Sequence, residues 1–253
     1  MTQRTILITG AGSGFGKGAA IELALRGHNV IAATETQEQA TALALECPTL
    51  ATIKLDVTSS ADIAQVGALK VDVLINNAGL GLMAPMATVP MERVRAAFDV
   101  NVFGMVEMCQ AVIPGMKDRG WGRIINLSSV AGFFAAALGS PYSMTKFAVE
   151  AFTKSLRAEM APHGIDVTKV NPGPYNTGFN DRMVNGITPY IEAGDESAEQ
   201  ASGMLHAVVL GNQLDPAEIV MALADLAEAE ETPPETILPE GIMAALQAAI
   251  GGA

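Results

Sequence analysis

Hydrophobic residues alternate along the chain between short runs of strand length and longer stretches with helical spacing. The short runs are predicted to be strands: Thr5–Thr9, Asn29–Thr34, Ala51–Leu55, Val71–Ile75, Gly122–Leu127, Asp166–Val170 and Glu235–Leu238. The longer stretches are predicted to be helices: Gly14–Arg26, Gln37–Glu46, Ala61–Ala68, Met91–Met116, Tyr142–Ala161 and Pro216–Glu230. This alternation predicts an α/β fold, a doubly wound sheet of about seven parallel strands with helices on both faces.

The last of these helices has the clearest start signal in the sequence. Asp215 is expected to be the N-cap, with Pro216 at the first helical position. Glu218, three residues after the cap, would complete a capping box.

The stretch from Thr177 to Leu214 contains no predicted strand, although it has short helical patterns at Asp195–Met204 and Leu205–Leu210. A segment of this length inside a compact domain is usually functional. We therefore expect one domain over residues 1–253, with a substrate lid around 178–214.

Acidic residues are unevenly distributed along the 253 residues, which carry 15 Lys+Arg and 27 Asp+Glu for a net charge of −12. Residues 1–182 hold all 15 basic groups and 15 of the acids, so the 12 remaining acids lie after Arg182 with no Lys or Arg among them. No basic stripe is present to neutralise phosphates. Nucleic acids and anionic membranes are therefore not expected as partners.

The cysteines and the apolar runs exclude further classes of protein. Cys47 and Cys109 have no CxxC or Cys/His partner pattern, so neither a disulfide nor a metal site is expected. The longest uncharged run, between Arg123 and Lys146, is interrupted by Ser, Gly and Pro, so no membrane span is expected. Because no signal-peptide pattern is found at the N-terminus, we expect a cytoplasmic protein.

A glycine-rich segment joins the first predicted strand to the first predicted helix, with the sequence Thr9-Gly10-Ala11-Gly12-Ser13-Gly14-Phe15-Gly16. Glycines permit a tight turn and close approach of the backbone, and a helix N-terminus presents free N–H groups to a phosphate. The position after the first strand of a βαβ unit favours dinucleotide binding over an ordinary turn.

Further motifs follow in the order that is typical of one enzyme family. Besides the TGxxxGxG spacing, they are Asp56-Val57, Asn76-Asn77-Ala78-Gly79, Asn101, Ser129, Tyr142-Ser143-Met144-Thr145-Lys146 and Pro172-Gly173 with Thr177. On these motifs the chain resembles the short-chain dehydrogenase/reductase family over residues 4 to about 180. The resemblance implies a Rossmann-type fold and an NAD(P)-dependent alcohol dehydrogenase or carbonyl reductase.

The resemblance also implies the cofactor contacts. In the family, the residue matching Asp56 bonds the adenine amino group, and the turn matching Pro172-Gly173 contacts the nicotinamide carboxamide. The expected cofactor-binding residues are Gly10, Gly12, Ser13, Gly14, Phe15, Gly16, Thr34, Glu35, Asp56, Val57, Asn77, Ala78, Gly79, Tyr142, Lys146, Pro172, Gly173 and Thr177.

The choice between NAD and NADP depends on the charge after the second strand. This chain has Thr34 where NAD enzymes of the family usually have Asp, and Glu35 follows it. No basic residue lies at Ser13 or among residues 34–37 to bind a 2′-phosphate. NAD is therefore favoured over NADP, with Glu35 as a displaced ribose ligand; a merely solvated loop acid is the alternative.

Tyr142 and Lys146 are four residues apart on one predicted helix, so their side chains share a face. Tyrosine acts as an acid/base at neutral pH only if a nearby cation lowers its pKa, and Lys146 is expected to do this. The family's spacing selects Ser129 over Ser128 as the substrate-oxygen ligand, and the resemblance assigns Asn101 a water that connects Lys146 to solvent. The expected catalytic residues are Asn101, Ser129, Tyr142 and Lys146.

The substrate is expected to be a neutral, largely apolar secondary alcohol or its ketone, because the candidate pocket residues are apolar. Ser129, Phe133, Tyr175 and Phe179 are the predicted substrate-binding residues. Further candidates to line or cover the pocket are Met83, Val130, Phe134, Met183, Ile187, Tyr190, Met204 and Leu205.

Two other functions stay open. One is a 3-ketoacyl-carrier-protein reductase of the same family, which needs basic surface near the mouth and NADP. Another is a non-catalytic NAD(P)-sensing regulator, although such proteins typically lose the Tyr or Lys that this chain retains at Tyr142 and Lys146.

A homodimer or homotetramer is expected, because related enzymes pair the helices matching Met91–Met116 and Tyr142–Ala161. The apolar residues expected at that interface are Met105, Met108, Val112, Phe147, Ala148, Ala151 and Phe152.

Overall fold

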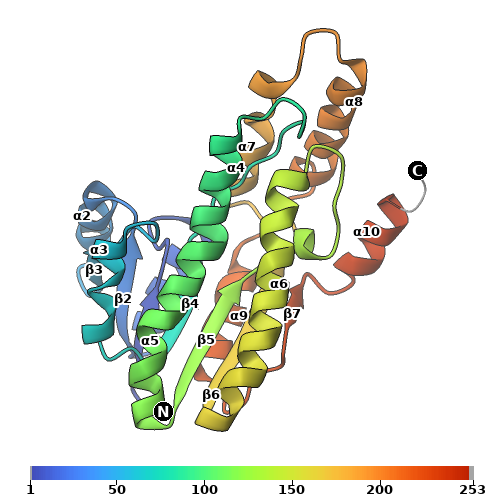
Figure 1. Cartoon of the computed structure of the whole chain (residues 1–253). Helices are drawn as coiled ribbons and strands as arrows, with labels where there is room; N and C mark the ends of the chain where they lie inside the picture. Colours follow the sequence, from blue (N-terminus) through green and yellow to red (C-terminus); the bar gives the residue numbers. More distant parts are fainter. Residues whose placement is uncertain (1, 251–253) are drawn as a thin grey trace.

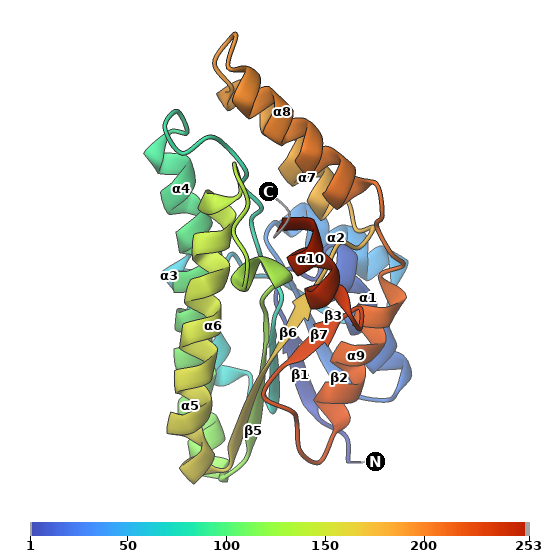
Figure 2. The same ribbon diagram turned by 90° about the vertical axis from the view of Figure 1, so that its right-hand side faces the viewer.

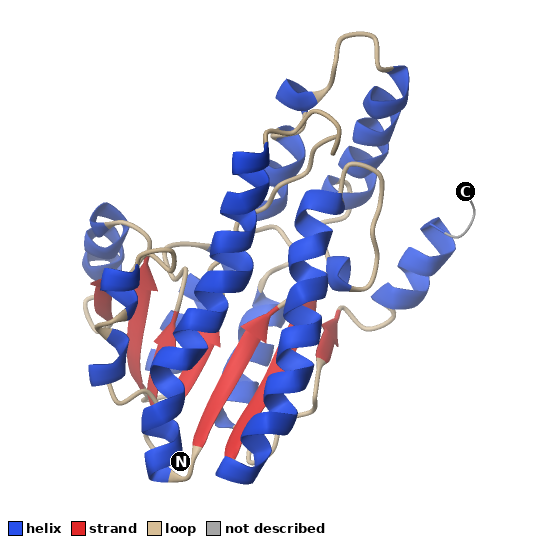
Figure 3. Ribbon diagram, viewed as in Figure 1, coloured by secondary structure: helices blue, strands red, loops and turns tan. Residues whose placement is uncertain are grey.

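Seven parallel strands form one sheet in the computed structural model, which describes residues 2–250 (Figures 1 and 3). Their order across the sheet is β3-β2-β1-β4-β5-β6-β7, which confirms the predicted doubly wound fold. The strands are β1 (Thr5–Ile8), β2 (Asn29–Thr34), β3 (Ala51–Lys54), β4 (Val73–Asn76), β5 (Gly122–Leu127), β6 (Ile165–Pro172) and β7 (Thr236–Leu238). The strand order reverses between β1 and β4, and ligands of such sheets bind beyond the carboxyl ends of the strands at this point.

Helices cover both faces of the sheet (Figure 2). On one face, α1 (Gly14–Leu25), α2 (Gln37–Glu46) and α9 (Ala217–Glu228) pack through one apolar cluster. The other face carries α3 (Ser60–Ile63), α5 (Met105–Arg119) and α6 (Ser140–Met160), packed through a second cluster. β4 and β5 are buried along their whole length between these layers, and their apolar residues Val73, Leu74, Ile75, Ile124, Ile125 and Leu127 lie in the core.

The helix predicted over Met91–Met116 is interrupted in the structure. α4 (Met91–Phe98) leads into a π-helical segment, Asp99–Gly104, and then into α5. Gly104 is required there, because a Cβ on it would lie 2.6 Å from the carbonyl oxygen of Val57. The predicted helix Ala61–Ala68 is also divided, into α3 and a 3₁₀ turn over Val66–Ala68.

The lid stretch contains α7 (Phe179–Asn185), which was not predicted, and α8 (Glu196–Leu205), which was. These helices extend past the carboxyl ends of the strands (Figures 1 and 2). A second unpredicted helix, α10 (Ile242–Ile250), follows β7 near the same end of the sheet.

The start of α9 differs from the predicted capping box. The helix begins at Ala217 with Pro216 as its N-cap residue, so the predicted start at Asp215 and Pro216 is one residue early. The Asp215 carboxylate still accepts a hydrogen bond from the backbone N–H of Ala217 at 2.9 Å. Glu218, however, accepts the hydroxyl of Tyr175 at 2.6 Å. The predicted capping box is therefore wrong, because the Glu218 carboxylate bonds Tyr175, from a distant part of the chain, and not the backbone at the helix start.

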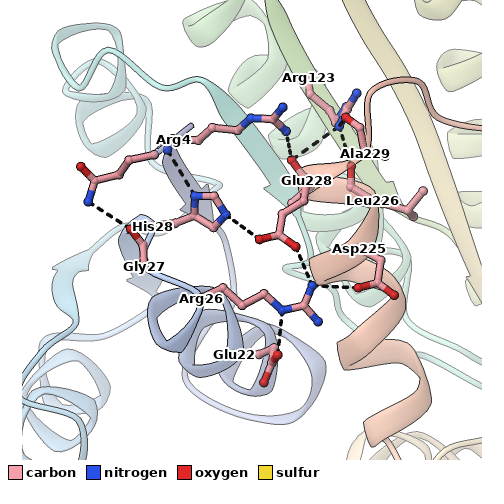
Figure 4. Close-up of polar contacts among 12 residues, drawn as sticks. Arg4, Glu22, Arg26, Gly27, His28, Arg123, Asp225, Leu226, Glu228 and Ala229 are labelled. Carbon is pink, nitrogen blue, oxygen red and sulfur yellow. Dashed lines mark hydrogen bonds and ion pairs between the residues drawn. The ribbon is translucent and has the colours of Figure 1, made fainter. Parts of the chain in front are cut away.

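A polar network at the opposite end of the sheet holds the C-terminal end of α9 (Figure 4). Arg123, on β5, is 1% exposed and donates to the carbonyl oxygens of Leu226 at 2.8 Å and Ala229 at 2.7 Å. Glu228 accepts from Arg26 at 2.7 Å and pairs with the ring of His28 at 2.9 Å. These contacts join α9 to β5 and α1.

One continuous helical stretch, Met91–Arg119, is long and apolar enough to cross a membrane by length and composition, with a mean hydropathy of 1.3. The core helices of soluble proteins share this length and composition. Here Met108, Cys109, Val112 and Met116 pack the stretch onto the sheet.

Candidate active site

A cleft of about 1050 Å³ lies beyond the carboxyl ends of the strands. The glycine loop, the ends of β3 to β6, α7 and α10 all contribute to its wall. Of the residues predicted to bind cofactor, Gly10, Gly12, Ser13, Gly14, Phe15, Glu35, Asp56, Val57, Asn77, Ala78, Gly79, Tyr142, Lys146, Pro172, Gly173 and Thr177 line it. Thr34 and Gly16 do not.

The glycine loop is packed tightly on the end of β4. Gly10 has a φ of +64°, and a Cβ there would lie 2.7 Å from the Cα of Ala78. Asn77 secures the loop by donating its side-chain amide to the carbonyl oxygens of Thr9 at 2.9 Å and Gly10 at 3.0 Å. Gly16 does not line the cleft, but the packing of Asn77 requires a glycine there, because a Cβ would lie 2.3 Å from the Asn77 side chain.

The N-terminus of α1 opens on the cleft without a capping side chain. Ser13 is the N-cap residue in an extended conformation, but its hydroxyl caps no N–H, and the first turn has no acidic residue. Free N–H groups and the positive end of the helix dipole suit an anion. The loop therefore fits the diphosphate of a dinucleotide.

Thr34 ends β2 and Glu35 follows it, but the two side chains lie in different surroundings. Thr34 is fully buried, and its hydroxyl donates to the carbonyl oxygen of Thr36 at 3.0 Å. The prediction that Thr34 touches the cofactor is wrong, because its side chain faces the core. Glu35 lines the cleft, together with Gln39 on α2.

Tyr142 and Lys146 come from α6, and Ser129 follows the end of β5. The ammonium of Lys146 lies 5.6 Å from the centre of the Tyr142 ring and donates to the carbonyl oxygen of Leu127 at 2.8 Å. The Ser129 hydroxyl donates to the carbonyl oxygen of Pro172 at 3.5 Å and accepts from the N–H of Ala131 at 3.1 Å. The tertiary structure thus brings the three predicted side chains together at one part of the cleft wall.

Burial dominates the ionisation of this group. It raises the pKa of Tyr142 well above its usual value, and the influence of the Ser129 side chain only partly offsets this. Burial also lowers the pKa of Lys146 to about 8, against the opposing charge of Glu150. The expected lowering of the Tyr142 pKa by Lys146 is not found here, because burial of the phenol is the dominant influence.

Asn101 lies in the π-helical segment, behind the cleft wall. Its side-chain amide donates to the carbonyl oxygen of Leu80 at 2.9 Å and to the hydroxyl of Thr145 at 3.0 Å. Its side-chain oxygen accepts from the Leu80 N–H at 2.7 Å. Asn101 therefore connects the π-helical segment to the loop after β4 and to the helix that carries Tyr142.

Two of the predicted substrate-binding residues are misplaced. The Phe133 ring is outside the cleft wall, 5.9 Å from the ammonium of Lys169. Tyr175 borders the cleft but is 1% exposed and gives its hydroxyl to Glu218, so it has no free polar group for a substrate. Both are held by partners from segments distant in sequence.

The remaining cleft residues near Tyr142 are mostly apolar. Phe179 lies 5.9 Å from the Tyr142 ring, centre to centre. Predicted residues that line the cleft are Met83, Val130, Phe179 and Met183; Phe134, Ile187, Tyr190, Met204 and Leu205 do not. The sequence reasoning missed Val208, Val209, Asn212, Leu214, Ile242, Ala245 and Leu246. The apolar run after Gly241 was the available signal for the last three.

The wall of the cleft carries more positive charge than the acidic excess after Arg182 suggests. Arg93 on α4 and Arg182 on α7 both line the cleft, and Arg182 lies within the stretch predicted to be a lid. Among the described residues, no group of three or more His, Cys, Asp or Glu side chains is placed to hold a metal ion.

Comparison with known proteins gives a consistent result. The sequence model of the family described as short chain dehydrogenase matches residues 4–187. A 3-ketodihydrosphingosine reductase of Bacteroides thetaiotaomicron is 37% identical over 195 residues, covering 74% of this chain and 70% of its own length. Human retinol dehydrogenase 8 is 37% identical over 193 residues, covering 72% of this chain and 62% of its own length.

Solved structures share the fold over nearly the whole chain. A short-chain dehydrogenase from Streptomyces avermitilis has a TM-score of 0.82 at 29% identity, covering 99% of this chain and 96% of its own. One from Sphingobium yanoikuyae, in complex with NADPH, has a TM-score of 0.77 at 28% identity, covering 98% and 93%.

Proposed function

The chain belongs to the short-chain dehydrogenase family, and we propose that it interconverts a neutral, largely apolar secondary alcohol and its ketone. The observation that carries this proposal is the convergence of Ser129, Tyr142 and Lys146 beside the apolar side chains of Phe179 and Met183. The three polar side chains suit one reacting oxygen of a substrate, and the apolar side chains beside them suit a hydrophobic body.

Each residue then has a role in the reaction. A bound nicotinamide ring supplies or accepts the hydride. Ser129 holds the substrate oxygen, and Tyr142 gives that oxygen a proton in ketone reduction or takes one in alcohol oxidation. Lys146 places a positive charge beside the Tyr142 ring, which favours the tyrosinate formed during reduction.

We infer that NAD is the preferred cofactor. Glu35 lines the cleft after β2, where a carboxylate accepts hydrogen bonds from ribose hydroxyls and repels a 2′-phosphate. The similar structures weigh against this inference, because the Sphingobium yanoikuyae enzyme is in complex with NADPH and a serine dehydrogenase, 30% identical, is in complex with NADP⁺.

The names of similar proteins support a bulky apolar substrate. They describe a 3-ketodihydrosphingosine reductase, a retinol dehydrogenase and human 17-beta-hydroxysteroid dehydrogenase type 1, the last 34% identical over 77% of this chain and 64% of its own length. Each name refers to a molecule with a large hydrocarbon body.

A matched panel of substrates tests the proposal. Steroid-like, aryl and long-chain alcohols and ketones are compared with short-chain and carboxylate-bearing analogues, with NAD(H) and NADP(H), by nicotinamide absorbance. We expect the highest kcat/KM for bulky neutral substrates; turnover of anionic substrates alone would overturn the substrate class. The Tyr142→Phe variant is expected to lose turnover and retain cofactor binding, whereas unchanged turnover would contradict the assigned chemistry.

A ketoacyl-carrier-protein reductase is the second candidate, and Arg93 and Arg182 are the observation in its favour. Both line the cleft, where cations would suit an acidic carrier. Activity with acyl-carrier thioesters that falls in Arg182→Gln would support this candidate over the first.

A further inference from the structure

A partly buried carboxylate lies directly behind the candidate active site. Glu150 follows Lys146 by one turn of α6, and its side chain is only 13% exposed. One carboxylate oxygen accepts the hydroxyl of Ser128 and the side-chain amide of Asn171, the latter at 2.6 Å. The other lies 2.9 Å from the ammonium of Lys169.

Asn171 extends this arrangement to the serine of the site. Its side-chain amide also donates to the carbonyl oxygen of Ser129 at 3.2 Å. Ser128 and Ser129 follow the end of β5 directly, so Glu150 holds this segment in two ways: directly through the Ser128 hydroxyl, and through Asn171 to the carbonyl oxygen of Ser129.

The charges around Glu150 are balanced. Lys169 is 10% exposed and lies 2.8 Å from Glu235, which is 42% exposed and lies beside β7. Facing groups are Lys146 from α6, Ser128 from the end of β5, Lys169 and Asn171 from β6, and Glu235 beyond Lys169. Without the Glu150 charge, two buried lysines would face one partly exposed carboxylate.

The fold does not require an ion pair at this place. β5 and β6 are already paired in parallel from Gly122 with Ile165 to Leu127 with Val170. A buried ion pair often contributes no more to stability than apolar residues of the same volume, because both charges must be desolvated. A charged group held by three hydrogen-bonding partners behind a catalytic lysine therefore suggests a role in the reaction.

We propose that Glu150 is a positioning residue, which fixes the Ser128–Ser129 backbone and sets the charge balance of the Tyr142–Lys146 pair. It acts through these residues and does not touch the reacting atoms. The inference rests on the proposed function, because it assigns Glu150 to the proton transfer of that reaction.

The charge of Glu150 opposes loss of a proton from either member of the pair. Its removal therefore lowers the apparent pKa of the Tyr142–Lys146 pair, whichever residue carries the titrating proton. Ketone reduction needs the protonated pair, so its rate falls as the pH rises through that pKa.

The Glu150→Gln variant keeps the shape of the side chain and removes the charge. We expect the alkaline limb of kcat/KM for reduction to move to lower pH by about one unit, an approximately tenfold loss on that side. On the acid side the rate is expected to stay close to that of the wild type. A uniform loss at every pH, or an unmoved limb, would overturn the proposal.

Two further variants sharpen the test. Glu159→Gln removes an exposed charge from the same helix and should leave the limb unmoved. Lys169→Met removes the cation that neutralises Glu150, so it should move the limb to higher pH. Opposite shifts in Glu150→Gln and Lys169→Met are not expected from a merely structural role. If Glu150→Gln does not fold, the upward shift in Lys169→Met alone decides.

A measurement without substrate separates this inference from the proposed function. The NMR titration of isotope-labelled lysine side chains, with the Lys146 signal assigned by its loss in Lys146→Met, reports the pKa of Lys146. Glu150→Gln should lower that pKa, and an unchanged titration would refute the inference. Absence of turnover with the substrate panel, with the NMR shift observed, would refute the proposed function only.

Discussion

Glu35 is the residue on which the proposed cofactor preference depends. The Glu35→Arg variant replaces a carboxylate of the cleft wall with a phosphate-binding group. We expect the ratio of kcat/KM for NADP to that for NAD to rise at least about tenfold, equivalent to about 1.4 kcal/mol. Steady-state kinetics with both cofactors measures the ratio.

Glu38→Arg is the matched control. Glu38 lies on α2, three residues after Glu35, and does not line the cleft. An equal rise in both variants would show that any added positive charge is sufficient, and that Glu35 is not a ribose ligand.

Lys146 is predicted to reduce stability at neutral pH. Its pKa is about 8 in the folded protein because burial disfavours the ammonium, against 10.5 for the ordinary group. The unfolded chain therefore binds more protons than the folded chain between these values, so stability rises with pH across that window. Relative to Lys146→Met, the wild type should gain about 2 kcal/mol of unfolding free energy between pH 7 and 9.5.

Urea denaturation of both proteins at the two pH values measures this difference. Lys154→Met, an exposed change on the same helix, should show no such trend. If the difference in unfolding free energy between the wild type and Lys146→Met does not change with pH, the lowered pKa of Lys146 is contradicted.

At the scale of elements, α9 depends on a cation that lies far from it in sequence. The guanidinium of Arg123 donates to the carbonyl oxygens of Leu226, Ala229 and Glu230 at 2.8, 2.7 and 3.2 Å. The Arg123→Met variant leaves these groups without that donor and should lower the unfolding free energy by about 3 kcal/mol. Chemical denaturation followed by circular dichroism measures the loss.

Lys17→Met is the comparison, because it removes a partly exposed pair with Glu46 and should have a much smaller effect. Equal losses in the two variants would show that the Arg123 contacts do not hold α9.

The π-helical segment is the other element that tertiary contacts shape. The apolar spacing from Met91 to Met116 predicted one regular helix, and no residue type in it marks a π segment. The close approach of Gly104 to Val57 and the three hydrogen bonds of Asn101 are visible only when β3, the loop after β4 and α6 are in place.

At the scale of the whole molecule, the exposed apolar side chains are where we expect a second copy to bind. Met91, Phe103, Met144 and Phe147 are 49, 55, 38 and 47% exposed, on α4, the π-helical segment and α6. Met105, Met108 and Val112, predicted at this interface, are buried in the protein's own core.

Phe147→Asp should therefore weaken self-association at least about tenfold, because burying the charge in an apolar interface is unfavourable. Light scattering after size-exclusion chromatography at several concentrations measures the mass. Leu25→Asp, on α1 and 78% exposed, is the control and should leave the mass unchanged. A monomeric wild type would contradict the expected homo-oligomer.

The sequence by itself determined the sheet, the glycine loop and the shared helix face of Tyr142 and Lys146. These features depend on local information: apolar runs bounded by turns, glycines where the backbone approaches closely, and Tyr142 and Lys146 one helical turn apart.

Only the tertiary structure decided which side chains face the cleft and how they ionise. Thr34, Phe133 and Tyr175 have partners that cannot be read from their neighbours in the chain. The same holds for Glu150, whose contacts come from two strand ends and whose charge acts on Lys146. Desolvation and long-range hydrogen bonds depend on segments that are distant in sequence and adjacent in space, so no local pattern contains them.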